Sequence, residues 1–198
     1  MNKSLNKTEV GFTLIELLVV IAIVAILSIV VLLTLNPAEL LRQARDSNRI
    51  SDLGTLKTAL SLYLSDTQIP NLASSSLNFT ACYLSTIQGN GTTSAKCGVF
   101  AYTGTTGGDA STTQDKYRKV NSQGWVPVDF SKLSIGTPFG SLPIDPSNNQ
   151  KFFYSYAASS TNVFEVNAIL ESNKYNNVML NDGGDNTSAY ETGSNLTL

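Results

Sequence analysis

The chain has 198 residues, a formal net charge of −2 and no histidine. Histidine is the commonest general base and metal ligand, so its absence excludes Ser-His and Cys-His nucleophile pairs. The slightly acidic balance, with a pI near 5.1, gives no general attraction to nucleic acid. We therefore expect no enzyme, no catalytic residue, no organic cofactor and no nucleic-acid partner.

Apolar residues are concentrated near the N-terminus. Residues 12–35 are almost wholly apolar, and as a helix these 24 residues would be ~36 Å long, enough to cross a bilayer core. The run is longer than the apolar part of a secretory signal, and the Asn36-Pro37-Ala38-Glu39 sequence after it is no signal-peptidase site. We predict a membrane-spanning helix over 12–35.

The residues on either side of this helix bear on its orientation. Lys3 and Lys7 precede it, and a basic N-terminal flank favours a cytoplasmic N-terminus, although three arginines follow the helix on the other side. Cys82 and Cys97 favour an exported C-terminal part, because an even cysteine pair in a Ser/Thr/Asn-rich region indicates one disulfide. Two free structural thiols are the alternative.

Glu16 is the single ionisable residue in the apolar run, four positions after Phe12. A carboxylate in hydrocarbon costs about 2.5–3.5 kcal/mol on the insertion scale, so such a residue usually has a partner or a task. Cleavage after Gly11 would expose an α-amino group on Phe12, which could pair with Glu16 of the same helix or of a neighbouring subunit. The alternative is a lone, partly hydrated Glu16 favoured by the positive end of the helix.

Residues 11–22, GFTLIELLVVIA, resemble the processing and assembly motif of type IV pilins and type II secretion pseudopilins. The resemblance rests on the combination of a basic leader, a Gly-Phe junction and a glutamate inside an apolar helix. It implies that residues 1–11 are a leader, that a prepilin peptidase cuts between Gly11 and Phe12, and that Phe12 is then N-methylated. It also implies that Glu16 helps to set the register between subunits.

The same resemblance implies a location and partners. Before assembly the protein would span the cytoplasmic membrane once, with its C-terminus outside, and an inner-membrane assembly platform would then build it into an extracellular homopolymeric filament. A type IV pilus subunit is the leading interpretation and a major pseudopilin of a type II secretion system is the alternative. A monomeric membrane-tethered adhesin is the third and least favoured hypothesis.

Helical periodicity continues beyond the membrane segment. Apolar residues recur at three- and four-residue spacing, which gives the helix one face that can pack on a core. These residues are Ile50, Leu53, Leu56, Leu60, Tyr63 and Leu64. Charged residues come before and beside this stripe, and their spacing suits a solvated or subunit-facing surface. They are Glu39, Arg42, Asp46, Arg49 and Asp52.

These patterns favour one long helix over 12–65, with its first part, 12–35, in the membrane or the filament core. Pro37 should kink it, and Gly54 should weaken it by about 1 kcal/mol. Two separate helices joined at Asn36-Pro37 are the alternative. The helix should end before Pro70, because the residue that precedes a proline avoids helical geometry.

Residues 66–198 are expected to form a globular head. Its first part, 66–120, is rich in Ser, Thr, Gly and Asn, and strand patterns follow within 121–198. The predicted strands are 124–130 at a sheet edge, a hairpin of 152–157 and 162–170, and Tyr190–Gly193. The sequence therefore predicts an α+β, type IV pilin-like fold, in which the C-terminal half of the long helix packs on an antiparallel sheet of three to four strands.

Asp182 and Asp185 lie in the oxygen-rich sequence NDGGDNT, residues 181–187. Calcium prefers oxygen ligands, although the spacing is not that of an EF-hand. Major pseudopilins as a group have a calcium site in their C-terminal region, so the resemblance makes these two aspartates the candidate ligands. A solvated turn is the alternative interpretation.

Overall fold

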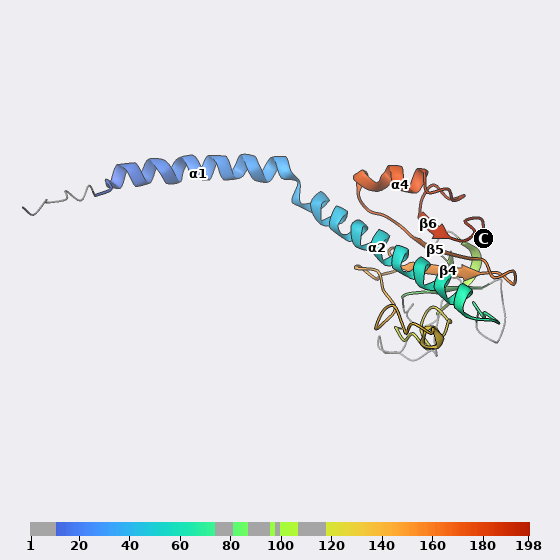
Figure 1. Ribbon diagram of the computed structural model, residues 1–198. Coiled ribbons are helices and arrows are strands. Elements are labelled where there is room, and N and C mark those ends of the chain that lie inside the picture. The colour runs from blue at the N-terminus through green and yellow to red at the C-terminus, as the bar shows by residue number, and fades with distance from the viewer. Residues whose placement is uncertain (1–10, 74–80, 87–95, 98–99, 107–117) are drawn as a thin grey trace, which may run out of the picture. The chain divides into compact units, whose positions relative to one another are not determined.

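The computed structural model describes residues 11–73, 81–86, 96–97, 100–106 and 118–198 (Figure 1). The chain divides into two compact units, Met1–Leu41 and Arg42–Leu198, and each is described by itself. Of the predicted leader, Gly11 lies within the described residues, and residues 1–10 lie outside them.

Helix α1 (Leu14–Leu35), blue in Figure 1, makes up most of the first unit. Leu, Ile, Val and Ala fill it, and no Gly or Pro interrupts it. Within the described residues, Leu14–Val31 is the one stretch of helix long and apolar enough to cross a membrane, with a mean hydropathy of 3.2. None of this stretch is buried. The predicted apolar helix is therefore present.

The expectation of one continuous helix is wrong at a single residue, Asn36. Helix α1 ends at Leu35, and α2 (Pro37–Asp66) begins two positions later. Asn36 has left-handed backbone angles, φ 40° and ψ 73°, and the ring of the proline that follows disfavours the right-handed helical conformation there.

Asn36 also starts the second helix. Its side-chain Oδ1 accepts a hydrogen bond from the backbone N–H of Glu39 at 3.4 Å, which is the bond of a helix N-cap. Pro37 then occupies the first helical position, where a missing N–H costs nothing. The sequence Asn36-Pro37-Ala38-Glu39 is therefore a helix-start signal.

The second unit contains a six-stranded sheet within the described residues, in the order β2-β3-β1-β4-β5-β6. The strands are β1 (Ala81–Leu84), β2 (Lys96–Cys97), β3 (Phe100–Thr106), β4 (Tyr154–Ala158), β5 (Phe164–Ala168) and β6 (Tyr190–Gly193). The run β1-β4-β5-β6 is antiparallel throughout, which gives the expected number of antiparallel strands. Strand β3 extends this run in parallel to β1, and β2 pairs with β3. Strands β1, β2 and β3 were not expected, because all three lie in the polar segment 66–120, for which no strand was predicted.

The predicted hairpin is confirmed. Strands β4 and β5 pair from Tyr154 opposite Ala168 to Ala158 opposite Phe164. The turn is closed by a hydrogen bond from the Ser159 N–H to the Val163 carbonyl at 2.9 Å. Strand β6 also has its predicted bounds. Between β5 and β6 lie two short helices, η2 (Asn173–Tyr175) and α4 (Asn176–Leu180).

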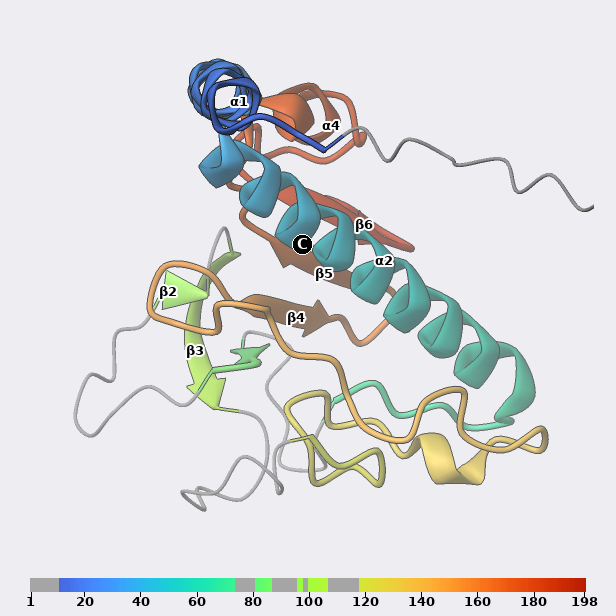
Figure 2. The ribbon, with the colours of Figure 1, turned by 90° about the vertical axis from the view of Figure 1, so that its left-hand side faces the viewer.

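Helix α2 packs on one face of this sheet. Figure 2 shows α2 in front of β5 and β6, and its fully buried residues Leu53, Leu56 and Leu60 belong to the same core cluster as strand residues. The strand residues in that cluster include Tyr154, Tyr156, Phe164, Val166 and Ala168. Alternate residues of β5, namely Phe164, Val166 and Ala168, therefore pack in the same core as the apolar stripe of α2. Ile50, at the start of the predicted stripe, is half-buried and lies outside the cluster.

The predicted edge strand at 124–130 is absent from the structure. The segment carries an isolated bridge between Asn121 and Asp129, followed by the short helix η1 (Phe130–Lys132). Trp125 and Val126 are both fully buried, whereas adjacent residues of a strand point to opposite faces. The Trp125 indole N–H donates to the Pro143 carbonyl at 2.9 Å, and the Phe130 N–H donates to the Val120 carbonyl at 2.8 Å, so side-chain and backbone hydrogen bonds together hold the segment.

Two glycines should respond in opposite ways to alanine. A Cβ on Gly193 would lie 2.2 Å from the backbone oxygen of Phe164, whereas a Cβ on Gly54 meets nothing within 4 Å. Overpacking a protein core typically costs about 1–3 kcal/mol, and we expect Gly193→Ala to lower the free energy of unfolding of the full chain by at least that amount. We expect Gly54→Ala, in the interior of α2, to stabilise it by about 0.5–1 kcal/mol. Thermal unfolding in detergent micelles measures both, and equal melting temperatures would contradict the packing described for β6.

Candidate functional site

The residues predicted for processing and assembly lie at the start of α1. Gly11 is exposed, and so is Phe12, with 75% of its surface accessible. Thr13 caps the helix, because its hydroxyl oxygen accepts the backbone N–H of Glu16 at 3.3 Å. In return the Glu16 carboxylate accepts the N–H of Thr13 at 3.4 Å and its hydroxyl at 3.3 Å. These reciprocal bonds form a capping box.

This geometry turns the Glu16 carboxylate back toward the helix start. The amide it contacts belongs to Thr13, the residue that directly follows Phe12. Cleavage between Gly11 and Phe12 would therefore leave the new α-amino group one residue from an amide that Glu16 already binds. The positive end of the helix and a new amine on Phe12 would both favour a negatively charged Glu16. Stabilisation of Glu16 by the helix start and pairing of Glu16 with the Phe12 amine are therefore compatible interpretations.

The remainder of α1 offers a continuous apolar surface. Its leucine, isoleucine and valine side chains are exposed along the described length, and Leu14 and Ile15 are 82% and 71% accessible. Soluble monomeric proteins rarely expose contiguous apolar patches larger than a few hundred Å². A surface of this kind requires lipid or other apolar helices around it.

Residues 11–32 match the family described as the prokaryotic N-terminal methylation motif. The match begins at the predicted cleavage junction and runs along α1. No curated protein and no solved structure matches the chain. The motif is the prepilin signature of type IV pilins and pseudopilins, and residues 11–32 of this chain carry it. Pilins and pseudopilins are a group of structural proteins.

The predicted calcium ligands have other contacts in the structure. Asp182 accepts the N–H of Gly184 at 2.9 Å on one oxygen and the N–H of Glu191 at 2.8 Å on the other, so it holds its loop against β6. Asp185 is exposed. Within the described residues, no group of three or more His, Cys, Asp or Glu side chains is arranged to hold a metal ion.

Two buried carboxyl groups beside this loop were missed. Glu165 on β5 and Glu191 on β6 are each only 1% exposed. Glu165 accepts the N–H of Leu198 at 3.1 Å, and Glu191 accepts the N–H of Asn186 at 2.9 Å. Burial raises the pKa of Glu165 to about 8, and burial also raises the pKa of Glu191. Strand alternation places both glutamates on the face opposite α2, which the sequence alone indicates as solvent-exposed.

A second missed cluster surrounds Arg49. The stripe of α2 was expected to begin at Ile50, and Asp46 and Arg49 were expected on a solvated or subunit-facing surface. That expectation is wrong, since both are fully buried. Counting back from Leu53 in steps of four and three reaches Arg49 and Asp46, so both continue the buried stripe. The sequence signal was the spacing, and the charge of these side chains concealed it.

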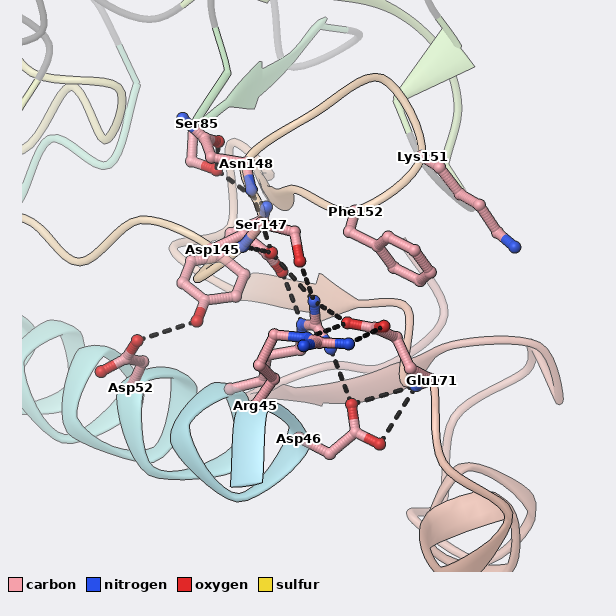
Figure 3. A network of polar contacts seen from close by, with 12 residues as sticks. Arg45, Asp46, Asp52, Ser85, Asp145, Ser147, Asn148, Lys151, Phe152 and Glu171 are labelled. Atoms are coloured by element: carbon pink, nitrogen blue, oxygen red, sulfur yellow. Dashed lines mark hydrogen bonds and ion pairs between the residues drawn. The ribbon is translucent and has the colours of Figure 1, made fainter. Parts of the chain in front are cut away.

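Arg49 binds three carboxylates. Its guanidinium donates to Asp145 through Nε at 2.6 Å and Nη2 at 2.9 Å, and to Asp46 through Nη1 at 2.7 Å. Nη2 also lies 2.7 Å from Oε1 of Glu171. Arg45 binds the same Glu171 at 2.6 Å, and the Arg45 hydrogen bond is the largest of the effects that lower the pKa of Glu171 to about 2. Figure 3 shows the labelled side chains of this network converging from separate parts of the chain.

Only one of the two cysteines of the predicted disulfide has a described side chain. Cys82 is fully buried in a smaller core cluster with Leu84, Phe153 and Ala157. Cys97 lies in β2 of the same sheet, but its side chain lies outside the described residues. The pairing of Cys82 with Cys97 stays a prediction.

The buried glutamates predict an unusual pH dependence. A carboxyl whose folded pKa is raised from 4.5 to about 8 stabilises the fold fully below the lower value, and this stability is lost as the pH rises through the higher one. The chain has no histidine, which would otherwise titrate in the same window. We therefore expect the melting temperature to fall between pH 5 and pH 8, and Glu165→Gln to flatten that slope.

Glu171→Gln is the matched control for this measurement. Its folded pKa of about 2 places its titration at acidic pH, so the slope between pH 5 and pH 8 should stay as in the unaltered chain. A slope unchanged by Glu165→Gln would show that the buried carboxyl does not bind the proton.

Proposed function

We propose that the chain is the structural subunit of an extracellular type IV pilus-like filament. A prepilin peptidase removes residues 1–11, the new N-terminus at Phe12 is methylated, and subunits pack through α1. The observation that carries this proposal is the methylation motif over residues 11–32, joined to a helix whose apolar surface the chain leaves uncovered. Before assembly, α1 anchors the subunit in the cytoplasmic membrane with the head outside.

Assembly needs a source of specificity other than hydrophobicity. Lipid tails are as apolar as leucine, so moving α1 from the bilayer into a bundle of helices gains little from apolar burial. A charge pair in apolar surroundings has a strict geometry and is costly to leave unpaired. Glu16 of one subunit and the Phe12 amine of a neighbour supply such a pair, and contacts between heads supply the remainder.

A major pseudopilin of a type II secretion system is the second candidate, because the motif is shared by both groups. A pilus and a pseudopilus differ in the machinery that accompanies them. A gene for a retraction ATPase next to the gene for this chain would support the pilus, and a gene for a secretion outer-membrane channel would support the pseudopilus. A monomeric tethered adhesin would require neither cleavage nor Glu16.

Glu16→Ala tests the assembly mechanism. The altered precursor should still be cut and inserted, because the junction at Gly11–Phe12 is intact, but its incorporation into filaments should fall at least tenfold for lack of the charge partner. Shearing of cells followed by quantification of chain in the filament and membrane fractions measures this. Glu39→Ala, which removes a carboxylate from the start of α2, is the matched control. Normal filaments from Glu16→Ala would end the proposed mechanism.

The mass of the mature protein tests processing. Loss of residues 1–11 leaves 187 residues, since 198 − 11 = 187. We expect the native protein to begin at Phe12 and to carry one methyl group on its α-amine. Intact mass and N-terminal peptide mass measure both features. Recovery of the Met1 N-terminus on filament-associated protein would overturn the proposal.

Calcium at the 181–187 loop is proposed as a ligand of the head, with Asp182 and Asp185 as candidate ligands. The support is their oxygen-rich sequence and the position of Asp182 against β6. Isothermal titration of the full chain in micelles should show calcium uptake that Asp185→Asn weakens, and a chelator should lower the melting temperature. Absence of uptake together with unchanged melting would reject calcium here.

A further inference from the structure

The contact face of α2 has two chemically different zones. Toward the C-terminal end of the helix its buried residues are apolar, namely Leu53, Leu56, Ala59, Leu60 and Tyr63. Toward the N-terminal end they are charged, and Asp46 is the first buried residue of the helix. We name residues 45–49 of α2, with Asp145, Glu171 and Ser172, the ionic zone.

The ionic zone joins α2 to two distant chain segments. Arg49 reaches Asp145, 96 positions away in the sequence. Asp46 accepts the N–H groups of Glu171 and Ser172, at 3.0 Å and 2.7 Å, and the Ser172 hydroxyl at 2.6 Å. Asp145 also accepts the backbone N–H of Ser147 at 2.7 Å. Both aspartates therefore hold loop backbone as well as the arginine.

The two zones differ in what opening them costs. Apolar contacts that separate expose hydrocarbon to water, which is unfavourable along the whole path. Charged groups that separate regain their hydration, and this offsets much of the lost attraction. A buried ion network therefore fixes the geometry of its groups closely but adds little net stability. Hydrogen bonds to charged groups are also lost within a short displacement, because their strength depends on distance and angle.

We propose that the ionic zone is a latch that lets residues 42–50 of α2 leave the head as a unit while residues 53–63 remain packed. This proposal rests on the filament function, since tension drawn through α1 reaches the head through α2, and Asp46 is the first residue of α2 that the head buries. Opening the latch lengthens the connection between anchor and head without unfolding the core. Closure restores one register, because Arg49 has fixed partners on three sides.

Hydrogen exchange of the full, unassembled chain in micelles tests the latch. The variant Arg49→Met/Asp145→Asn removes the central pair but leaves an amide oxygen for the loop N–H groups. We expect amide exchange of residues 42–50 to become at least tenfold faster, with exchange of residues 56–63 unchanged within about twofold. Leu60→Ala, in the apolar zone, is the control and should accelerate residues 56–63.

Two results would overturn the proposal. Equal acceleration of 42–50 and 56–63 in the double variant would show that the ionic zone is part of one cooperative core, and no acceleration would show that it does not hold α2. Arg45→Gln removes only the outer pair with Glu171, and it replaces the double variant in the exchange experiment if the double variant does not fold. It is judged by the same comparison. Because the measurement uses unassembled chain, its outcome is independent of whether filaments form.

Discussion

The exposed apolar surface of α1, over Leu14–Val31, is the constraint on which the other features of this protein depend. A stretch of 18 exposed and strongly apolar helical residues, Leu14–Val31, requires lipid or other apolar helices around it. Glu16 is tolerable in such surroundings because Thr13 and the helix start bind its carboxylate. The capping box therefore presents a carboxylate beside the position where the proposed cleavage would create an amine.

The head contacts the long helix α2 along one narrow face, which carries all of its buried residues. Apolar residues on α2 and on the strands β4 and β5 form the larger part of this contact. Apolar packing alone allows a helix to shift by a turn at modest cost, because it is not directional. Arg49, bound by three carboxylates, removes that freedom and specifies where along α2 the head sits.

Over β5 and β6 the second face of the sheet is polar and nevertheless buried, since Glu165, Asn167 and Glu191 are each at most 2% exposed. Asn167 on β5 lies directly opposite Glu191 on β6, and the Asn167 Nδ2 and one oxygen of Glu191 are buried without a hydrogen-bond partner. Their positions on adjacent strands are complementary, since one atom is a donor and the other an acceptor. Burial of this face also raises the pKa values of Glu165 and Glu191, because the charged carboxylate is disfavoured away from water.

The sequence by itself determined the features that arise from neighbouring residues. The apolar run, the Gly11–Phe12 junction and the β4–β5 hairpin each depend on residues close in the chain, and their patterns were readable. Asn36 was readable too, as an N-cap before a proline, although we favoured a continuous helix. Only the tertiary structure decided that Asp46 and Arg49 are buried, because their partners come from segments about a hundred positions away. A charge in a buried stripe is stable only when such partners arrive, and local periodicity carries no record of them.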